Sequence, residues 1–371
     1  MSICSADRRR WLRFRAVLLP FTLATVLVFV SHTTINAGET FNKPQKAPGQ
    51  ALWVKSEGFF SLLPARALTH SGIARPQLVF GDPVASAGGL TIDGDGNLWG
   101  SVAAGAVHGA ISFVFELTPK QLRRLANHQK VKPAIEMDNE GGFPIRFDSA
   151  GNLWVATPPP YGAALEMYSP EQLVSGPAPL PARNFTFDNT VGAITDFAFD
   201  TAGNLWVDSN YGPNPTGQTG LSEFTPDQIG TSANSLTPRL QLPDAAGKAL
   251  AFDSSGDLWA ATEIAIDMFR PNQLTGFGVQ SPTPAVTIQS ARVGRGGSFG
   301  DPDGLTFDAQ GDLWIASAAD VGGNNYGGVS EIAASDLTVS GSPQPLVVLR
   351  ANHRRTNLDV PSLMVFGPPL Q

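Results

Sequence analysis

The stretch LTFDAQGDLW, residues 305–314, joins a short alternating strand, a tight turn and a tryptophan, and the chain repeats it four more times. The sister copies read LTIDGDGNLW (residues 90–99), IRFDSAGNLW (145–154), FAFDTAGNLW (197–206) and LAFDSSGDLW (250–259). In each copy the tryptophan follows a Leu and comes six residues after an Asp. The tryptophans are 55, 52, 53 and 55 residues apart. This spacing is typical of arrays of small β units, most often the blades of a propeller.

Each copy predicts a hairpin between two strands. Residues 305–307 alternate apolar and polar side chains, as a half-buried strand does. In the turn at residues 200–204 we expect the Asp200 side chain to accept hydrogen bonds from backbone N–H groups two or three residues further on. Gly203 supplies the positive φ of a tight hairpin. The repeated motif is therefore interpreted as structural.

A third strand follows in each repeat and ends in an acid and an apolar residue. In three repeats a Ser or Thr and then a Pro come next, as at residues 118–119, and this pair is typical of the start of a helical turn. The acids suit the free N–H groups of such a turn, so they too are interpreted as structural. They are Glu116, Glu166, Glu223, Asp267 and Glu331.

The number of blades follows from two fragments at the ends of the chain. Trp53 lies in ALWV (residues 51–54), and strand-like stretches follow at 63–68 and 76–80, but no first strand precedes it. Residues 363–366 fit a first strand and nothing follows them. Pairing of the two ends would complete a sixth blade and remove exposed sheet edges. The sequence therefore predicts an all-β, six-bladed β-propeller over residues 51–371, closed by its C-terminal strand.

These hairpins resemble those of six-bladed, NHL-repeat-like propellers, a group that includes gluconolactonase-like and virginiamycin B lyase-like proteins. The resemblance covers residues 51–367. A gluconolactonase-like protein would hold a divalent cation in its central channel with a Glu, two Asn and an Asp. No repeat begins with the Glu-Gly-Pro phrase expected for that Glu. A lyase of the virginiamycin type would use a channel His as base, for which His108 and His353 are the candidates in loops.

The N-terminus predicts export. Residues 1–37 combine five arginines with an apolar run at 16–30, which is typical of a signal peptide. Cleavage near Ala37 and retention as an uncleaved membrane anchor both remain open, as do the Sec and twin-arginine routes. Residues 38–50 are polar and rich in Gly, Pro and Lys, so we expect a flexible lead-in. The predicted location is periplasmic or extracellular.

Charge and cysteine content exclude some classes of function. Without residues 1–37 the chain has 20 basic and 31 acidic residues, a net charge of −11. Such a surface repels phosphate backbones and anionic lipid, so nucleic acid is excluded as a partner and a membrane is met only through an uncleaved N-terminal segment. Cys4, the sole cysteine, lies in the export segment. The mature fold therefore rests on core burial without disulfides.

The loops between the second and third strands of the blades are the predicted ligand site. These loops are longer after Trp99, Trp154, Trp206 and Trp314 than after the other two tryptophans. Three of the longer loops carry Tyr-Gly and the fourth carries His-Gly. We expect these aromatic residues to surround one mouth of the channel and to stack on a sugar or another planar ligand; the alternative is that each Tyr-Gly is a duplicated loop pivot. They are Tyr161, Tyr211, Tyr326 and His108.

A metal site in the channel is the alternative prediction. Asp208 and Asn210 directly follow the strand of Trp206, and Asp196 and Asp303 each stand just before a first strand. With Glu263 they form the predicted ligand set, because Ca²⁺ and Mg²⁺ prefer carboxylate and amide oxygens. Further oxygen-bearing residues expected on this face are Glu140 and Asp359.

Two functions follow from these sites. The first is an exported platform that binds a small molecule, a carbohydrate or a protein and requires no cofactor. The alternative is a metal-dependent hydrolase, lactonase-like, or a lyase, with its site in the central channel and Ca²⁺ or Mg²⁺ as cofactor. Because a fold does not imply a function, the sequence leaves open whether the protein is an enzyme.

Overall fold

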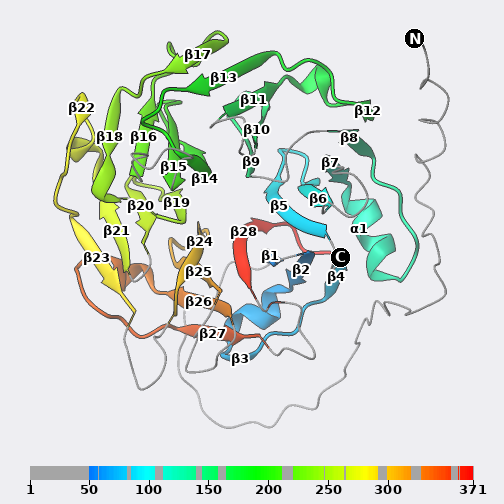
Figure 1. The fold of residues 1–371 in the computed structure, drawn as a ribbon. Helices are drawn as coiled ribbons and strands as arrows, with labels where there is room; N and C mark the ends of the chain where they lie inside the picture. The colour runs from blue at the N-terminus through cyan, green and yellow to red at the C-terminus, as the bar shows by residue number, and fades with distance from the viewer. Residues whose placement is uncertain are drawn as a thin grey trace, which may run out of the picture.

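The computed structural model describes residues 50–56, 58–81, 85–104, 112–138, 144–157, 164–210, 220–245, 247–262, 265–290, 299–318, 327–351, 358 and 360–370. These residues form six antiparallel sheets arranged around a central axis (Figure 1). The predicted six-bladed β-propeller is confirmed. The predicted export segment and most of the lead-in lie outside the described residues.

Each blade has four antiparallel strands that follow one another outward from the central axis. From the innermost strand to the outermost, blade 1 consists of β28 (Pro361–Gly367), β1 (Ala51–Ser56), β2 (Phe59–Leu63) and β4 (Leu78–Gly81). Blade 2 consists of β5 (Ala85–Ile92), β6 (Leu98–Ala104), β7 (Ser112–Leu117) and β8 (Ile135–Asp138). Blade 3 consists of β9 (Ile145–Phe147), β10 (Leu153–Thr157), β11 (Ala164–Tyr168) and β13 (Arg183–Phe187).

The other three blades follow the same plan. Blade 4 consists of β14 (Ala193–Phe199), β15 (Leu205–Asn210), β16 (Gly220–Phe224) and β18 (Leu240–Leu242). Blade 5 consists of β19 (Ala249–Phe252), β20 (Leu258–Ala261), β21 (Ala265–Phe269) and β23 (Val286–Gln289). Blade 6 consists of β24 (Pro302–Phe307), β25 (Leu313–Ser317), β26 (Gly328–Ile332) and β27 (Val347–Arg350).

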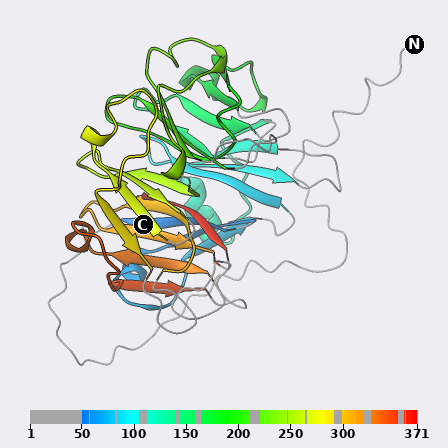
Figure 2. The ribbon, with the colours of Figure 1, turned by 60° about the vertical axis from the view of Figure 1, so that its left-hand side comes forward.

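The ring closes in blade 1, as predicted. Strand β28 pairs with β1 in antiparallel register, from Ala51 opposite Gly367 to Ser56 opposite Pro361. In the oblique view of Figure 2, β28 (red) lies within the ring beside β1 (blue). The third strand of this blade differs from the prediction: it is β2, and the stretch expected as a strand at 63–68 mostly forms a 3₁₀ helix, Ala65–Thr69.

The repeated turn is held by one carboxylate that accepts three or four hydrogen bonds. In blade 3, Asp148 Oδ1 accepts from the backbone N–H groups of Ala150 and Asn152, which are two and four residues on rather than two or three. Asp148 Oδ2 accepts from the Asn152 amide and from the Trp154 indole at 2.9 Å. The same indole bond, at 2.8–3.3 Å, is made in four sister copies. We call this arrangement the Asp–Trp motif; it explains the six-residue spacing.

Each tryptophan also packs against the following blade. The Trp154 ring meets Phe199 of blade 4 at 5.2 Å between centroids, and Trp259 meets Phe307 of blade 6 at 5.9 Å. Both phenylalanines come directly before the Asp of their own repeat. Each of six apolar clusters joins two neighbouring blades, so the core is a ring of interfaces between sheets. Burial of such large rings supplies much of the stability.

Most of the outermost strands are covered by a segment of the next blade, a feature that the sequence did not predict. Short strands pair in parallel with β8, β13, β18 and β27, and Gly341 bridges to Ile288 of β23. In four of these five cases a serine hydroxyl also accepts a backbone N–H of the outer strand. The added edge strands are β12 (Gly176–Pro177), β17 (Ala233–Leu236), β22 (Gly278–Val279) and β3 (Gly72–Ile73). Edges that would otherwise invite aggregation are thereby paired.

Helical turns follow the third strands. In blade 2 the turn extends to an α-helix, α1 (Pro119–Ala126), which begins with a capping box between Thr118 and Gln121. Among the described residues, strand β4 of blade 1 has no added edge strand, and it lies next to this helix (Figure 1). In blades 3, 5 and 6 the turns are the short 3₁₀ helices Pro170–Gln172, Pro271–Gln273 and Ala334–Leu337. A further 3₁₀ helix, Pro243–Ala245, follows the outermost strand β18 of blade 4. Across the described residues, no helix has the length and hydropathy needed to cross a membrane.

Candidate functional site in the central channel

Two of the predicted metal ligands lie side by side in blade 4. Asp196 of the innermost strand β14 is the cross-strand partner of Asp208 of β15. Both side chains are buried, with 1% and 0% of their surface exposed. Directly opposed residues of an antiparallel pair point to the same face of the sheet, so the structure brings these two carboxyl groups together.

Both carboxylate oxygens of Asp196 accept hydrogen bonds from the protein. Arg146 Nη2 of blade 3 lies 2.8 and 2.9 Å from its two oxygens, and Arg146 Nε donates to the Phe197 carbonyl. The backbone N–H of Phe197 donates to Oδ1 and that of Leu250, in blade 5, donates to Oδ2. The carboxylate therefore ties three blades together beside the channel. Such charge-assisted bonds are strong when they are shielded from water.

Asp208 is held much more loosely. Its Oδ1 accepts from the Gly247 backbone N–H at 3.3 Å, and its Oδ2 is a buried oxygen without a hydrogen bond in the described structure. Burial raises the pKa of Asp208 well above its ordinary value, and the neighbouring Asp196 charge raises it further. Burial therefore favours the neutral form of the Asp208 carboxyl group. Gly247 permits the close approach, because a Cβ there would lie 1.7 Å from the Ala261 carbonyl oxygen.

A second charged group lies between blades 5 and 6. Lys248 Nζ is 2.6 Å from Asp301 Oδ2 and 3.1 Å from Asp303 Oδ1. Burial alone would lower the pKa of Lys248, but the two carboxylates outweigh it and raise the pKa. Burial also raises the pKa of Asp303, and the Lys248 ammonium opposes this only in part. Asp303 is thus an ion-pair partner in this structure.

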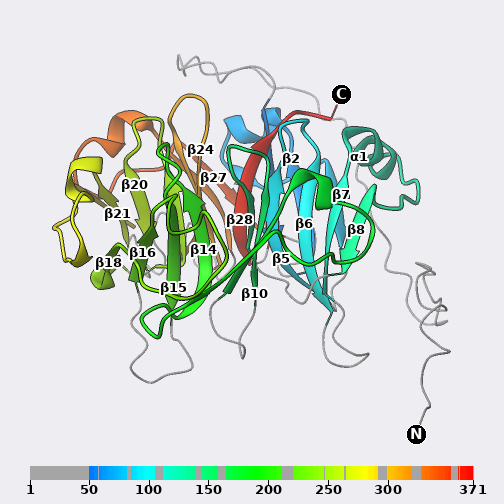
Figure 3. The same cartoon turned by 90° about the horizontal axis from the view of Figure 1, so that it is seen from above.

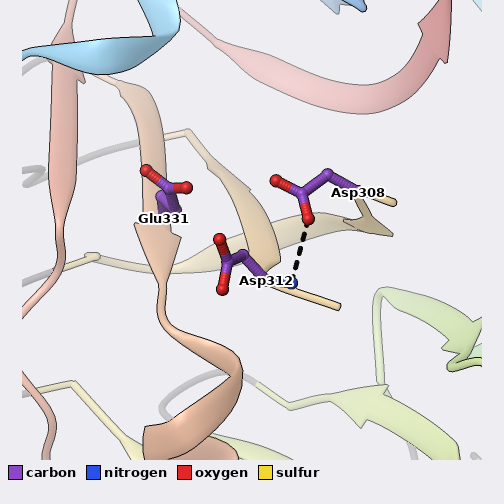
Figure 4. Close-up of side chains that lie close together, drawn as sticks. All are labelled: Asp308, Asp312 and Glu331. Atoms are coloured by element: carbon purple, nitrogen blue, oxygen red, sulfur yellow. Dashed lines mark hydrogen bonds between the residues drawn. The ribbon is translucent and has the colours of Figure 1, made fainter. Parts of the chain in front are cut away.

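Three further carboxylates gather at the outer end of the Asp–Trp motif in blade 6 (Figure 4). Asp308, Asp312 and Glu331 each offer an oxygen within 4.8 Å of the others. Asp312 replaces the Asn found in blades 2–4, and its Oδ1 accepts the Ala334 N–H at 2.8 Å. Asp308 keeps its structural bonds to the turn and to Trp314. The Asp in place of Asn was the sequence signal for this cluster, which our sequence analysis missed.

Comparisons with known proteins support the architecture. No protein family and no curated protein sequence matches the chain. A solved structure of a protein of unknown function from Bacteroides caccae matches 86% of this chain and 99% of that chain, with 10% identity and a TM-score of 0.55. A structure described as a putative gluconolactonase matches 82% and 88%, with 15% identity and a TM-score of 0.46. A gluconolactonase from Xanthomonas campestris matches 71% and 86%, with 15% identity and a TM-score of 0.38.

These similarities concern the fold alone. The chain is a six-bladed β-propeller, and gluconolactonase-like propellers are among the structures that resemble it. At 10–15% identity, a shared fold carries no activity across to this chain. The site must therefore be judged on its own chemistry.

The described channel residues do not by themselves fit the divalent cation that the gluconolactonase-like resemblance implies. Asp196 accepts four hydrogen bonds, and Asp303 is paired with Lys248. Asp208 Oδ2 is a buried oxygen of this set that has no hydrogen bond among the described residues. Ca²⁺ takes six to eight oxygen ligands, so most of a coordination sphere would have to come from elsewhere.

Several predicted site residues lie outside the described part of the chain. Glu263 is one, and Asn210 is described only through its backbone, as the last residue of β15. Glu140, Asp359 and His353 also fall outside it. So do all four predicted ligand-stacking residues, namely Tyr161, Tyr211, Tyr326 and His108. The stacking and metal assignments remain predictions.

Arg146 and Lys248 are the channel residues that the sequence analysis missed. Arg146 had a visible signal: it occupies a position that is Thr91, Ala198, Ala251 or Thr306 in the sister copies. A cation that replaces small residues at one position of a repeat marks a blade-specific contact. Lys248 lies just before β19, in a linker where no repeat pattern draws attention to it.

Proposed function

We propose that the chain is an exported recognition platform that binds a small molecule, a carbohydrate or a protein on the face where the second strand of each blade leads to the third. The strand register supports this proposal. The loops of Tyr161, Tyr211 and Tyr326 leave equivalent pairs, with Thr157 opposite Ala164, Ser209 opposite Gly220 and Ser317 opposite Gly328. The loop of His108 leaves the pair of Ala103 and Ser112. All four loops therefore start at the same end of the blades.

The channel wall is consistent with recognition rather than reaction. The charges of Asp196 and Asp303 are compensated by Arg146 and Lys248, which cross from blade to blade. Such pairs make a rigid support for loops, and binding residues are commonly placed on loops of a rigid scaffold. Export in this proposal rests on residues 1–37.

Replacing Tyr161, Tyr211 and Tyr326 together by Ala is expected to lower affinity at least about tenfold for a ligand found on a glycan array, because aromatic stacking surface is lost. Isothermal titration calorimetry measures the loss. Tyr168→Phe is the matched control, since Tyr168 is the fourth tyrosine of the chain and is buried with its hydroxyl donating to Glu166. Unchanged affinity in the triple variant would contradict the assignment.

A channel hydrolase or lyase that depends on a metal ion is the second candidate. One observation favours it: Asp208 places an oxygen with no hydrogen bond in a buried position beside a second carboxylate. Elemental analysis of the purified protein and a melting curve with added Ca²⁺ test it. A bound ion should raise the melting temperature, and the rise should vanish in Asp208→Asn. Equal melting curves with Ca²⁺ and with a chelator leave the recognition platform as the better proposal.

Asp208→Asn is also expected to change the pH dependence of stability in the metal-free protein. The folded state holds the Asp208 proton more tightly than the unfolded chain. Its favourable contribution is therefore complete below the unfolded pKa of about 3.9 and is lost as pH rises through the folded pKa. The neutral amide avoids that loss, so the variant should melt about 2–4 °C above the wild type at pH 8 and gain less at pH 4. Thermal unfolding by circular dichroism measures both differences, and an equal difference at both pH values would show that Asp208 is not neutral.

A further inference from the structure

Closure of the ring changes the Asp–Trp motif in blade 1. Five tryptophans donate their indole N–H to an Asp six residues earlier, but Trp53 belongs to a strand that is paired with the other end of the chain. Phe366 pairs with Leu52 as Phe199 pairs with Leu205, so Gly367 occupies the place of the Asp. Trp53 is 1% exposed, and its indole N–H has no acceptor among the described residues.

Gly367 offers the Trp53 indole no side-chain acceptor. A Cβ at this position would lie 2.3 Å from Ile92 Cδ1, and the Trp53 Nε1 atom would be 3.6 Å away. Ile92 precedes Asp93 in blade 2, where the sister repeats have Phe. The Ile92 side chain therefore occupies the space beside Gly367, and the Trp53 indole donor is left without the carboxylate that its sister tryptophans have.

A cavity of about 300 Å³ lies at this place, and we call it the closure pocket. Trp53, Leu122 of α1, Pro368 and Leu370 supply apolar lining. Arg123 of α1 also lines the cavity and brings a cation, and Asp95 brings the one carboxylate of the lining. In Figure 3 the helix α1 and the C-terminus lie together at one face of the ring.

Blade 2 departs from its sisters in a way that leaves this space. In blade 3 the nearest neighbour of a Cβ built on the hairpin glycine, Gly151, is Pro170 of the following 3₁₀ turn, at 3.8 Å. In blade 2 the corresponding Gly96 instead faces Pro368 of the C-terminal segment at 3.2 Å. The turn has become helix α1, and the cavity lies between the helix and that segment.

We propose that the closure pocket binds a small carboxylate with a compact apolar body, whose oxygens accept from Trp53 Nε1 in place of the missing Asp and face the Arg123 guanidinium. Indole and guanidinium groups are donors only, so the ligand must bring acceptors. A charged acceptor makes the stronger bond. The volume is at the lower limit of ordinary ligand pockets, which suits a body about as large as one aromatic ring. The Asp95 carboxylate would repel a ligand with several negative charges, but it would attract the ammonium group of a zwitterionic ligand.

This site is independent of the proposed recognition face. The closure pocket is bordered by the Asp95–Gly96 hairpin, which joins the first and second strands of blade 2. The predicted ligand loops join second to third strands and so leave the opposite ends of the blades. Failure of one proposal therefore has no bearing on the other.

Nitrogen-15 spectra of the tryptophan indoles in the purified chain test the proposal. Hydrocinnamate at about 1 mM and above is the probe, because weak millimolar binding is expected for so small a ligand. The Trp53 indole resonance, assigned by its loss in Trp53→Phe, should shift on titration. The five indoles that donate to Asp should stay in place and act as internal controls. Phenethylamine, which has the same ring with a cation, should leave Trp53 unshifted.

Variants on the exposed face of α1 complete the test without touching the core. Arg123→Gln should weaken hydrocinnamate about fivefold or more, because one charged partner is lost. Arg124→Gln is the matched control, since Arg124 is also exposed on α1 but donates to Gln129 away from the pocket. No shift of Trp53, a shift produced equally by phenethylamine, or equal affinity of the two arginine variants would overturn the proposal.

Discussion

Deletion of residues 361–371 is expected to abolish the folded ring. Strand β28 is the innermost strand of blade 1, and it also lies next to β24 and β5 of the neighbouring blades. Met364 belongs to the cluster between blades 6 and 1, and Phe366 meets Trp314 at 5.9 Å. Met364 is buried and Leu363, Val365 and Phe366 are partly buried, so the apolar side chains of β28 together contribute roughly 3–6 kcal/mol. This is a large part of the about 5–15 kcal/mol by which a domain is stable.

Circular dichroism and gel filtration measure the outcome. The shortened chain should lose its cooperative thermal transition and should aggregate through the free edge of β1. A peptide of residues 358–371, added in excess, should restore the transition, because the strand is bound by pairing rather than by its covalent link. The matched control deletes residues 370–371 alone, which leaves β28 intact. A cooperative melt within a few degrees of the control would show that the ring does not need this closure.

The second large effect is expected for Asp148→Ala in the Asp–Trp motif of blade 3. The change removes the acceptor of four hydrogen bonds, including the indole N–H of the buried Trp154. Buried donors left without acceptors are costly, so the free energy of unfolding should fall by about 3–5 kcal/mol. Urea unfolding followed by circular dichroism gives this value.

Ser149→Ala is the control for that experiment. Ser149 is exposed in the same turn, and no side-chain hydrogen bond of the motif involves it. Its replacement should change the free energy of unfolding by less than about 0.5 kcal/mol. A loss below about 1 kcal/mol for Asp148→Ala would mean that Trp154 is held by packing against Phe185 and Phe199 alone.

The fold was predictable because the same short sequence motif recurs in five blades and determines a hairpin by itself. The Asp, Gly and Trp of the motif are close in sequence, so the hairpin could be predicted without knowledge of the rest of the chain. The indole bond to Asp was not foreseen, although it explains the six-residue spacing. The added edge strands could not be predicted, because two-residue segments such as Gly176–Pro177 have no periodicity and acquire their partners only when blades assemble.

The candidate site was predictable only in part. Asp196 and Asp208 were both chosen as candidates from the sequence, and the cross-strand register places them side by side. The partner of Asp196 is Arg146, fifty residues away and on another blade, and nothing local to either residue indicates that contact. The closure pocket depends on α1 and on the C-terminal segment, which meet only because the ring closes. Contacts between blades such as these cannot be predicted from the repeated motif, because the motif determines only the structure within one blade.

The register of the closure has a mechanical consequence. Residue 51 pairs with residue 367, so chain segments attached to these two residues leave the sheet at the same end of the ladder. Tension applied at residues 50 and 370 would break the β1–β28 pairs one after another, as a zipper opens. Tension applied at residues 50 and 360 would load all the pairs at once. The force needed to separate β1 from β28 is therefore expected to be lower when tension acts at residues 50 and 370 than when it acts at residues 50 and 360.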